Sequence, residues 1–357
     1  MTVPLPSHLF VEVTSNCNLA CPHCYIEAGD GRQRQLSYET VEAAIGEFKE
    51  TGGVRFTLSG GEPTLHERWR DILSAALKAG LATEIITNGT RFLDKDLDFL
   101  TDNPIAIDIS LEAANATTHD AIRGKGSFAT TTETIERLLT RRLGHRITLC
   151  FSPMQHNCNE LQAVFDWAER HAIKRVYISL LENRGRAKRQ GDGFAPTVSQ
   201  KQALIADLVT VMARPRTTEV EAPNLRFFPE RLLGSVSVAE PIDRTLRMTP
   251  DGELFFTAYL DADPFRLGRY LPGNLAVAWS SDKVKSAFLA CKSRVILMPE
   301  CRQCWIYELC QGGSAMFAWN KAKGFFDVDS YCAPKRAYVE ATLRSANHGV
   351  FTSQAVF

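Results

Sequence analysis

The stretch "SNCNLACPHCYIEAG", residues 15–29, holds Cys17, Cys21 and Cys24 at spacings of four and three residues. It directly follows "LFVEV" at 9–13, an apolar run that predicts a β-strand. Zinc is one interpretation, because three thiolates and a distant fourth ligand could close a structural site. The spacing favours three corners of an iron–sulfur cubane instead, since the irons of such clusters take cysteine thiolates. One iron would then be left for an outside ligand.

Strand-like runs and amphipathic helices alternate with the first strand over the first two thirds of the chain. Helical patterns occupy 37–51 and 159–171, with Ser37 and Asn159 as expected N-caps. A strand–helix repeat of this kind implies parallel strands with right-handed crossovers, hence an α/β fold with a partial (β/α)6 barrel. The loops after the strands would form its working face. The five further strands are expected at 54–58, 83–87, 105–111, 147–152 and 175–180.

The pattern changes after a helix expected at about 199–213. The segment "TLRMTPDGELFFTAY" predicts a β-hairpin turned at Pro250-Asp251-Gly252, and residues 291–334 are cysteine-rich and irregular. We therefore expect a barrel domain over 1–215, a linker over 216–240, and a small cysteine-rich domain with a C-terminal tail over 241–357.

The composition restricts the classes of partner. Forty-one basic residues balance forty-one acidic ones, so no net field would attract nucleic acid or an anionic membrane. No apolar run reaches the roughly 18 residues of a membrane span, and the N-terminus lacks a signal peptide. We expect a cytoplasmic protein that binds neither nucleic acid nor membrane. Its ten cysteines then point to metal binding rather than to disulfides.

A second motif, "TLSGGEPTL" at 57–65, lies at the end of the second expected strand. Two glycines let the backbone approach a ligand closely, and an adjacent carboxylate can accept hydrogen bonds from an ammonium group. In this order, "CNLACPHC" and "SGGEP" resemble the signature motifs of the radical S-adenosylmethionine (radical SAM) enzymes. That resemblance covers nearly the whole chain.

The resemblance implies a [4Fe–4S] cluster held by the three cysteines of the first loop. The open iron would be chelated by the amino and carboxylate groups of SAM, and an electron from the cluster would cleave SAM to methionine and a 5′-deoxyadenosyl radical. The protein positions such a cofactor, and the cofactor supplies the chemistry. Gly60, Gly61 and Glu62 are implied as contacts of the SAM amino group.

The segment "ISLEAANATTHDAIRGKGSF" at 109–128 resembles the fourth-strand region of the peptide-modifying branch. Carried over from that branch, Ser110 would lie near the SAM ribose, and Arg123 would bind its carboxylate with its guanidinium fork. The branch usually has Leu-Asp-Gly where this chain has Leu111-Glu112-Ala113. The role of Glu112 is therefore open.

Three further features have two interpretations each. His23, between two of the cysteines, would contact the adenine of SAM, or it is an ordinary loop histidine. Leu180 would line the adenine pocket, or it is a core residue. The basic run "NRGRAKR" at 183–189 is a solvated loop, or it binds an acidic substrate segment or a phosphate.

A second cysteine cluster lies in "CRQCWIYELCQGGSAMFAWNKAKGFFDVDSYC" at 301–332. Its spacing fits either zinc or a four-iron cluster. The run resembles the SPASM extension of radical SAM enzymes, in which four such cysteines ligate an auxiliary [4Fe–4S] cluster. A second auxiliary cluster would need cysteines where this chain has Thr257 and Ser314, so we predict one, with a role in electron transfer rather than structure. Its ligands would be Cys301, Cys304, Cys310 and Cys332.

Cys150, Cys158 and Cys291 remain. A cysteine outside a cluster is usually a small buried apolar residue. The sharper hypothesis is a thiol that returns a hydrogen atom to a substrate radical, for which Cys158 and Cys291 are the candidates. Cys291 could also be an additional cluster ligand.

The resemblance implies hydrogen abstraction from a substrate, and we expect maturation of a ribosomally made peptide by crosslinking, epimerisation or oxidation. The alternative substrate is a sugar, aminocyclitol or other small molecule. A non-catalytic electron carrier is disfavoured, because a carrier needs neither an open iron nor "SGGEP". Expected partners are an electron donor such as flavodoxin or ferredoxin and, since the chain begins almost at its first strand, a separate leader-peptide-binding protein.

Overall fold

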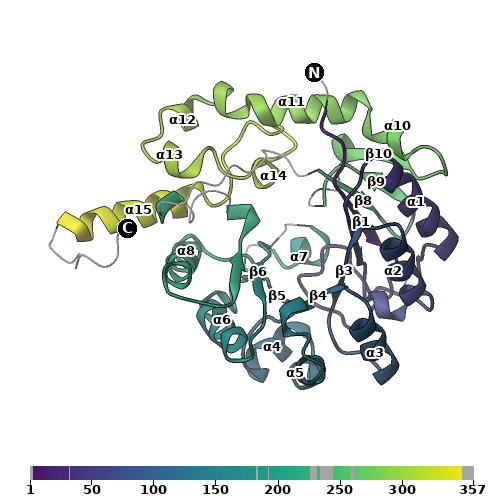
Figure 1. Ribbon diagram of the computed structural model, residues 1–357. Coiled ribbons are helices and arrows are strands. Elements are labelled where there is room, and N and C mark those ends of the chain that lie inside the picture. The colour runs from purple at the N-terminus through teal and green to yellow at the C-terminus, as the bar shows by residue number, and fades with distance from the viewer. Residues whose placement is uncertain are drawn as a thin grey trace.

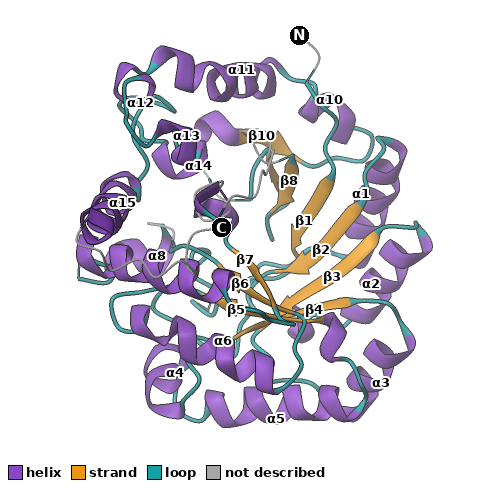
Figure 2. Ribbon diagram, turned by 60° about the vertical axis from the view of Figure 1, so that its left-hand side comes forward, coloured by secondary structure: helices purple, strands orange, loops and turns teal. Residues whose placement is uncertain are grey.

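One ten-stranded sheet forms the centre of the protein, with helices packed around it (Figure 1, Figure 2). The computed structural model describes residues 3–31, 33–181, 184–191, 193–225, 231–233, 244–258, 260 and 262–347. The strand order is β10-β9-β8-β1-β2-β3-β4-β5-β6-β7. The strands are β1 His8–Glu12, β2 Arg55–Ser59, β3 Ala82–Thr87, β4 Ala106–Ser110, β5 Ile147–Phe151, β6 Arg175–Ile178, β7 Glu219–Glu221, β8 Thr245–Met248, β9 Glu253–Phe255 and β10 Arg266–Arg269.

The strands from β1 to β7 are all parallel to their neighbours, which confirms the predicted α/β barrel with its six strands. β7 is a seventh parallel strand that the sequence analysis did not predict. It lies within the expected linker over 216–240, of which residues 226–230 and 234–240 are outside the described residues. Because β7 and β10 are the two ends of the strand order, hydrogen bonds do not close the barrel within the described residues. The division into two domains stays a prediction.

The helices follow the predicted alternation. Ser37 caps α1 by accepting a hydrogen bond from the Thr40 amide, as predicted. The predicted cap at Asn159 is wrong, because a 3₁₀ turn over Cys158–Glu160 precedes α6 and Asn159 lies inside it. The helices are α1 Tyr38–Glu50, α2 Trp69–Lys78, α3 Asp94–Asp102, α4 Ala116–Arg123, α5 Ser127–Thr140, α6 Leu161–Arg170, α7 Gly185–Arg189, α8 Val198–Ala213, α10 Leu275–Trp279, α11 Asp282–Leu297, α12 Pro299–Arg302, α13 Tyr307–Cys310, α14 Ala315–Ala318 and α15 Cys332–Asn347.

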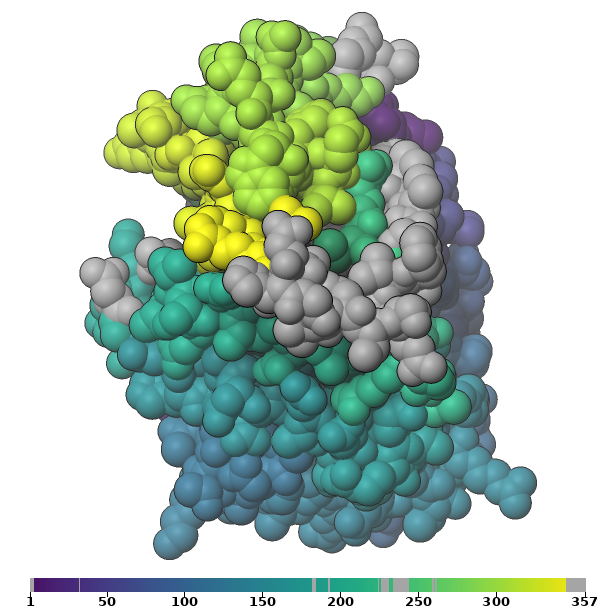
Figure 3. Space-filling view, turned by 90° about the vertical axis from the view of Figure 1, so that its left-hand side faces the viewer, coloured from purple at the N-terminus to yellow at the C-terminus, as the bar shows by residue number. Residues whose placement is uncertain are grey.

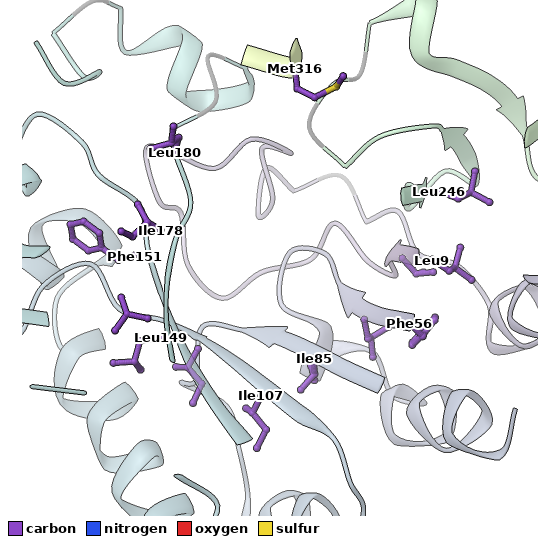
Figure 4. Close-up of a cluster of buried hydrophobic side chains, with 14 of the residues drawn as sticks. Leu9, Phe56, Ile85, Ile107, Leu149, Phe151, Ile178, Leu180, Leu246 and Met316 are labelled. Atoms are coloured by element: carbon purple, nitrogen blue, oxygen red, sulfur yellow. The ribbon is translucent and has the colours of Figure 1, made fainter. Parts of the chain in front are cut away.

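Alternate residues of the barrel strands point to opposite faces of the sheet. One set is apolar and belongs to the buried core that includes the helices, as Figure 4 shows for Leu9, Phe56, Ile107 and Leu149. Each such side chain contributes about 1.5–3 kcal/mol by burial. The other set is mostly polar and lines a cavity inside the barrel. The sequence pattern therefore builds a barrel with an apolar outside and a polar inside.

The C-terminal part continues the sheet at β1. β8 pairs with β1 in parallel, and β8 and β9 form the predicted hairpin, in which the Gly252 amide donates to the Thr249 carbonyl. Helix α15 packs against α8, and Figure 3 shows the yellow C-terminal residues beside teal ones of the barrel. Among the described residues, no helix is long and apolar enough to cross a membrane.

Candidate active site

The cavity inside the barrel measures about 450 Å³ and brings together the residues of both sequence motifs. Cys17, Cys21 and Cys24 line it, and so do Gly60 and Gly61. The cysteine loop follows the carboxyl end of β1, and the glycines follow that of β2. Because parallel strands end at the same rim of a barrel, these loops meet there.

The cysteine loop is folded so that amides point at sulfur. The Leu19 amide donates to Cys17 Sγ at 3.4 Å, and the Ala28 amide donates to Cys24 Sγ at 3.3 Å. Burial, together with the nearby Glu62 carboxylate and the Cys21 and Cys24 thiols, raises the pKa of Cys17 to about 11. A thiolate at Cys17 therefore needs a bound cation to stabilise it, and amide–sulfur hydrogen bonds of this kind support metal-bound thiolates.

Within the described residues, no three His, Cys, Asp or Glu side chains converge closely enough to hold a single metal ion. A four-iron cluster instead distributes its thiolate ligands over separate iron atoms. The donor set of three cysteines on one cavity wall thus fits a cluster better than one zinc ion.

The two glycines fix the cysteine loop to the second strand. The Gly61 amide donates to the Thr14 carbonyl at 2.7 Å, and the Glu62 amide donates to the Asn16 carbonyl at 2.8 Å. A Cβ atom on Gly61 would lie 2.1 Å from the Asn16 carbonyl oxygen, and one on Gly60 would lie 2.6 Å from that of Thr14. Only glycine allows this approach, so the motif sets the position of the first cysteine.

Glu62 is fully buried directly behind the glycines. Its carboxylate accepts hydrogen bonds from the Thr64 amide and hydroxyl, the Thr87 hydroxyl at 2.8 Å and the Asn88 amide at 2.8 Å. Burial raises its pKa despite these donors. In the structure Glu62 therefore joins the loops after β2 and β3, whereas the sequence analysis assigned it to the SAM ammonium. Asn88 lines the cavity and was missed by the sequence analysis.

Arg123, at the end of α4, points into the cavity and is held by Glu112. Its Nη2 donates to Glu112 Oε1 at 2.6 Å, and the Ser152 amide donates to Glu112 Oε2 at 2.9 Å. His23 Nε2 lies 3.5 Å from the same Oε1. Burial lowers the pKa of His23 to about 4, so its ring is neutral at pH 7. Glu112, whose role the sequence left open, connects Arg123 and His23.

His23 presents an unsatisfied atom at the cavity. Within the described residues, its Nδ1 is buried and has no hydrogen-bond partner. A buried polar atom without a partner costs free energy unless a ligand or water satisfies it. The ring therefore suits contact with a polar ligand.

Ser110 and Leu180 are placed differently by the alternation of the strands. Ser110 ends β4 and lines the cavity, where the sequence analysis put it. Leu180 has the same parity as Ile178 and packs in the hydrophobic core (Figure 4). Its neighbour Ser179 lines the cavity instead. The structure thus supports the core interpretation of Leu180 rather than the adenine pocket.

Cys150 is the only cysteine outside the two clusters that lines the barrel cavity in the described part of the chain. Its Sγ lies 3.9 Å from Asp108 Oδ2. Burial and the neighbouring Glu84 carboxylate raise the pKa of Asp108 well above its usual value. Burial also acts to raise the pKa of Glu84, but the charge of Arg55, whose Nη2 lies 2.6 Å from Glu84 Oε2, and hydrogen bonds from Asp108 and Thr57 together lower it. Burial and the Glu84 carboxylate thus favour the protonated form of Asp108, which lies next to a thiol.

The two thiols predicted as hydrogen donors lie elsewhere. Cys158 is buried in the turn before α6, and Cys291 is buried in α11 within the core. Neither lines the barrel cavity. Because Cys150 pairs with Ser110 across β4 and β5, it faces the inside of the barrel. The alternation within β5 could have identified Cys150, because it lies on the same face of the strand as the polar Thr148.

The basic run at 184–189 supports the cysteine loop. Arg186 donates to the carbonyls of Cys21 at 2.8 Å and Ala28 at 2.7 Å. The guanidinium of Arg184 stacks 4.3 Å from the centre of the Tyr25 ring. Arg189 pairs with Glu27 at 2.7 Å. Arg184 and Arg186 therefore contact the cysteine loop, whereas Lys188 and Arg189 are exposed, so only the C-terminal end of the run is solvated. Asn183 lies outside the described residues.

All four cysteines of the second cluster line one cavity of about 70 Å³. Cys301 and Cys310 are buried, and burial raises the pKa of both thiols. The buried side chain of Lys335 places its Nζ 3.9 Å from Cys310 Sγ and 3.1 Å from Asp329 Oδ2. Four thiols that line one cavity beside a buried cation suit an anionic metal cluster.

The positions where further cluster ligands would be needed are occupied by other contacts. Thr257 is buried, and its hydroxyl lies 3.7 Å from Met316 Sδ. The Ser314 amide donates to Asp329 Oδ2 at 3.1 Å. Met316 thus fills space beside Thr257.

Known proteins resemble this chain in sequence and in fold. Residues 11–157 match the Radical SAM superfamily. The chain is 28% identical to the PqqA peptide cyclase of Ruegeria pomeroyi, over 98% of this chain and 93% of that protein. It is 27% identical to the mycofactocin maturase MftC of Mycobacterium ulcerans, over 86% of this chain and 82% of that protein. The solved structure of native anSMEcpe with bound AdoMet and Kp18Cys peptide superposes with a TM-score of 0.75 at 16% sequence identity. The superposition covers 97% of this chain and 100% of that one.

Proposed function

Because the chain belongs to the radical SAM superfamily, whose members use SAM and a [4Fe–4S] cluster, we propose that it abstracts hydrogen in the maturation of a ribosomally made peptide. The observation that carries the proposal is the cavity on which the three-cysteine loop and the paired glycines converge. Similarity over nearly the whole chain to a protein named for cyclising a peptide supports the choice of substrate. When bound and reduced, the cluster would supply the electron that cleaves SAM.

The residues of the chain would hold and orient these groups. Cys17, Cys21 and Cys24 would ligate the cluster, while backbone beside Gly60 and Gly61 would face the SAM amino group. Arg123 would bind the carboxylate of SAM with its guanidinium fork, oriented by Glu112. The neutral ring of His23 and the hydroxyl of Ser110 would contact the adenosine. The barrel wall would keep water from the reacting carbon.

The second cavity would hold one auxiliary [4Fe–4S] cluster on Cys301, Cys304, Cys310 and Cys332. Thr257 and Ser314 offer no thiolates, and their contacts with Met316 and Asp329 support a single auxiliary cluster. With four cysteine ligands no iron is open to substrate, so the cluster would transfer electrons. A flavodoxin or ferredoxin would supply electrons from outside. Cysteines that ligate clusters rather than forming disulfides fit a reducing compartment such as the cytoplasm.

We assign the role of hydrogen donor to Cys150 in place of Cys158 and Cys291. In that step the S–H bond of Cys150 breaks and a C–H bond forms on the substrate radical, leaving a sulfur radical. One electron from the external reductant and the proton of the adjacent Asp108 would restore the thiol. Asp108 is placed for this transfer at 3.9 Å.

The proposal is tested by anaerobic reconstitution with iron, sulfide, SAM and dithionite, in the presence of short peptides encoded beside the gene. We expect 5′-deoxyadenosine together with a mass change in one peptide. A loss of two daltons would indicate oxidation or crosslinking, and solvent deuterium in the product would indicate epimerisation. Formation of 5′-deoxyadenosine with modification only of a sugar would overturn the peptide assignment, and no 5′-deoxyadenosine would overturn the reaction class.

A further inference from the structure

Lys335 is the most deeply buried cation near the second cysteine cavity, with a side chain that is 0% exposed. It lies in the first turn of α15, three residues after Cys332. Its Nζ is within 3.9 Å of Cys310 Sγ, a hydrogen-bond distance for sulfur, and its one carboxylate partner is Asp329 at 3.1 Å. Burying a lysine is costly, so its position beside a thiol needs a reason.

A second buried cation contacts the backbone that lines the same cavity. Arg294 of α11 donates to the backbone carbonyls of Gly312, Phe325 and Asp327. Gly312 lines the cavity, and the charge of Arg294 acts on Cys301. Two buried positive charges thus contact residues that line the cavity, Lys335 at Cys310 and Arg294 at Gly312, against one buried carboxylate, Asp329. The other charged residues that line it, Glu300 and Arg336, are exposed and of opposite sign.

Charge and hydrogen bonding at the sulfurs set the reduction potential of an iron–sulfur cluster. Each electron that enters adds negative charge, so a buried cation that donates a hydrogen bond to a thiolate stabilises the reduced form more than the oxidised form.

We propose that Lys335 raises the reduction potential of the auxiliary cluster through its hydrogen bond to Cys310 and so makes that cluster an electron acceptor. The inference rests on the proposed function, because it requires the auxiliary cluster to be present.

Lys335 also has a structural contact that the test must separate from this role. Asp329 Oδ2 accepts from Lys335 and from the Ser314 amide, and a Cβ atom on Gly313 would lie only 1.5 Å from the same oxygen. In Lys335→Gln an amide can still donate to Asp329, but the charge is gone. In Lys335→Arg the charge stays. Lys201 is a matched control, because it donates to the Ser330 carbonyl in the adjacent loop.

The experiment uses the full chain carrying Cys17→Ala, Cys21→Ala and Cys24→Ala, so that the paramagnetic signal comes from the auxiliary cluster alone. Iron content is measured first, followed by a potentiometric titration monitored by EPR. We expect Lys335→Gln to lower the ratio of reduced to oxidised cluster at fixed potential at least tenfold, which is about 59 mV for one electron. In Lys335→Arg and Lys201→Gln, the ratio of reduced to oxidised cluster should stay within about threefold of that in the chain carrying only the three cysteine substitutions.

The converse variant keeps the inference testable if Lys335→Gln loses its cluster. Asp329→Asn leaves Lys335 in place and removes the opposing charge, so it should shift the ratio in the other direction. An unchanged ratio in Lys335→Gln at equal iron content, or in Asp329→Asn, would overturn the role of Lys335. A parent protein without a four-iron cluster would overturn the auxiliary cluster itself, whereas SAM cleavage by the chain with its three cysteines intact would still support the radical reaction.

Discussion

Arg123 and Glu112 form an ion pair of 2.6 Å beside the cysteine loop, with side chains that are 11% and 0% exposed. The pair joins the end of α4 to the end of β4, and the Ser152 amide adds β5 through Glu112. Burial alone would raise the pKa of Glu112, but the charge and hydrogen bond of Arg123 together with the His23 ring and the Ser152 amide lower it. The carboxylate therefore stays charged at neutral pH and fixes the guanidinium toward the cavity.

Replacing Glu112 with Gln should destabilise the protein by about 3 kcal/mol, because it leaves a buried guanidinium without its counter-charge. Binding of SAM should weaken as well, since Arg123 is no longer held in place. Urea unfolding and calorimetric titration with SAM measure the two effects. The control is Asp94→Asn, which breaks an exposed pair with Arg137 and should cost less than about 1 kcal/mol. Equal stability of Glu112→Gln and Asp94→Asn would contradict the role of the pair.

Replacing Gly61 with Ala should displace the cysteine loop, because the new Cβ would meet the Asn16 carbonyl oxygen at 2.1 Å. We expect loss of iron from the first site and at least a roughly tenfold fall in 5′-deoxyadenosine formation, equivalent to about 1.4 kcal/mol. Gly46→Ala is the control, since that glycine lies in α1 with nothing within 4 Å of its Cβ position. It should stabilise the helix by about 0.5–1 kcal/mol. Normal iron content in Gly61→Ala would refute this use of the glycine.

The raised pKa of Cys17 predicts slow alkylation in the iron-free protein. With a pKa of about 11, the thiol is protonated at pH 8, and only the thiolate reacts with iodoacetamide. The rate should therefore rise with pH through about 11, above the range of an ordinary cysteine. Mass spectrometry of the peptide that contains Cys17 gives the rate at each pH, and loading with iron should abolish the reaction. A rate that levels off near pH 9 would contradict the burial of this thiol.

Replacing Cys150 with Ser should stop the return of a hydrogen atom to the substrate while leaving SAM cleavage intact. For the epimerisation reaction run in deuterated water, the wild-type product should carry deuterium and the Cys150→Ser product should not. Cys158→Ser is the matched control, because that thiol is buried outside the cavity. Both variants should still form 5′-deoxyadenosine. Equal deuterium incorporation in wild type and Cys150→Ser would exclude Cys150 as the donor.

The sequence predicts the barrel well because its signals are local. Strands such as β1 and β2 are short apolar runs between loops, and the three cysteines must share one loop whatever the rest of the chain does. The hairpin at Pro250-Asp251-Gly252 is equally local. These features need no knowledge of distant contacts.

The remaining parts of the site depend on contacts between distant segments. Arg186 meets Cys21 across 165 residues of sequence, so its support of the cysteine loop could not be read from a basic run. Cys150 differs, because the alternation within β5 already places it on the same face as Thr148. The alternation that places Ile178 in the core also places Leu180 there, which decides between its two interpretations. The cap at Asn159 failed because a 3₁₀ turn replaced the first turn of α6.

The central claim is that a three-cysteine cluster in the barrel binds SAM and cleaves it. The most direct measurement compares 5′-deoxyadenosine formed by the wild type, Cys17→Ala and Cys304→Ala under dithionite. We expect formation in the wild type, none in Cys17→Ala, and partial formation without complete turnover in Cys304→Ala. Equal amounts of 5′-deoxyadenosine from the wild type and Cys17→Ala would contradict the account.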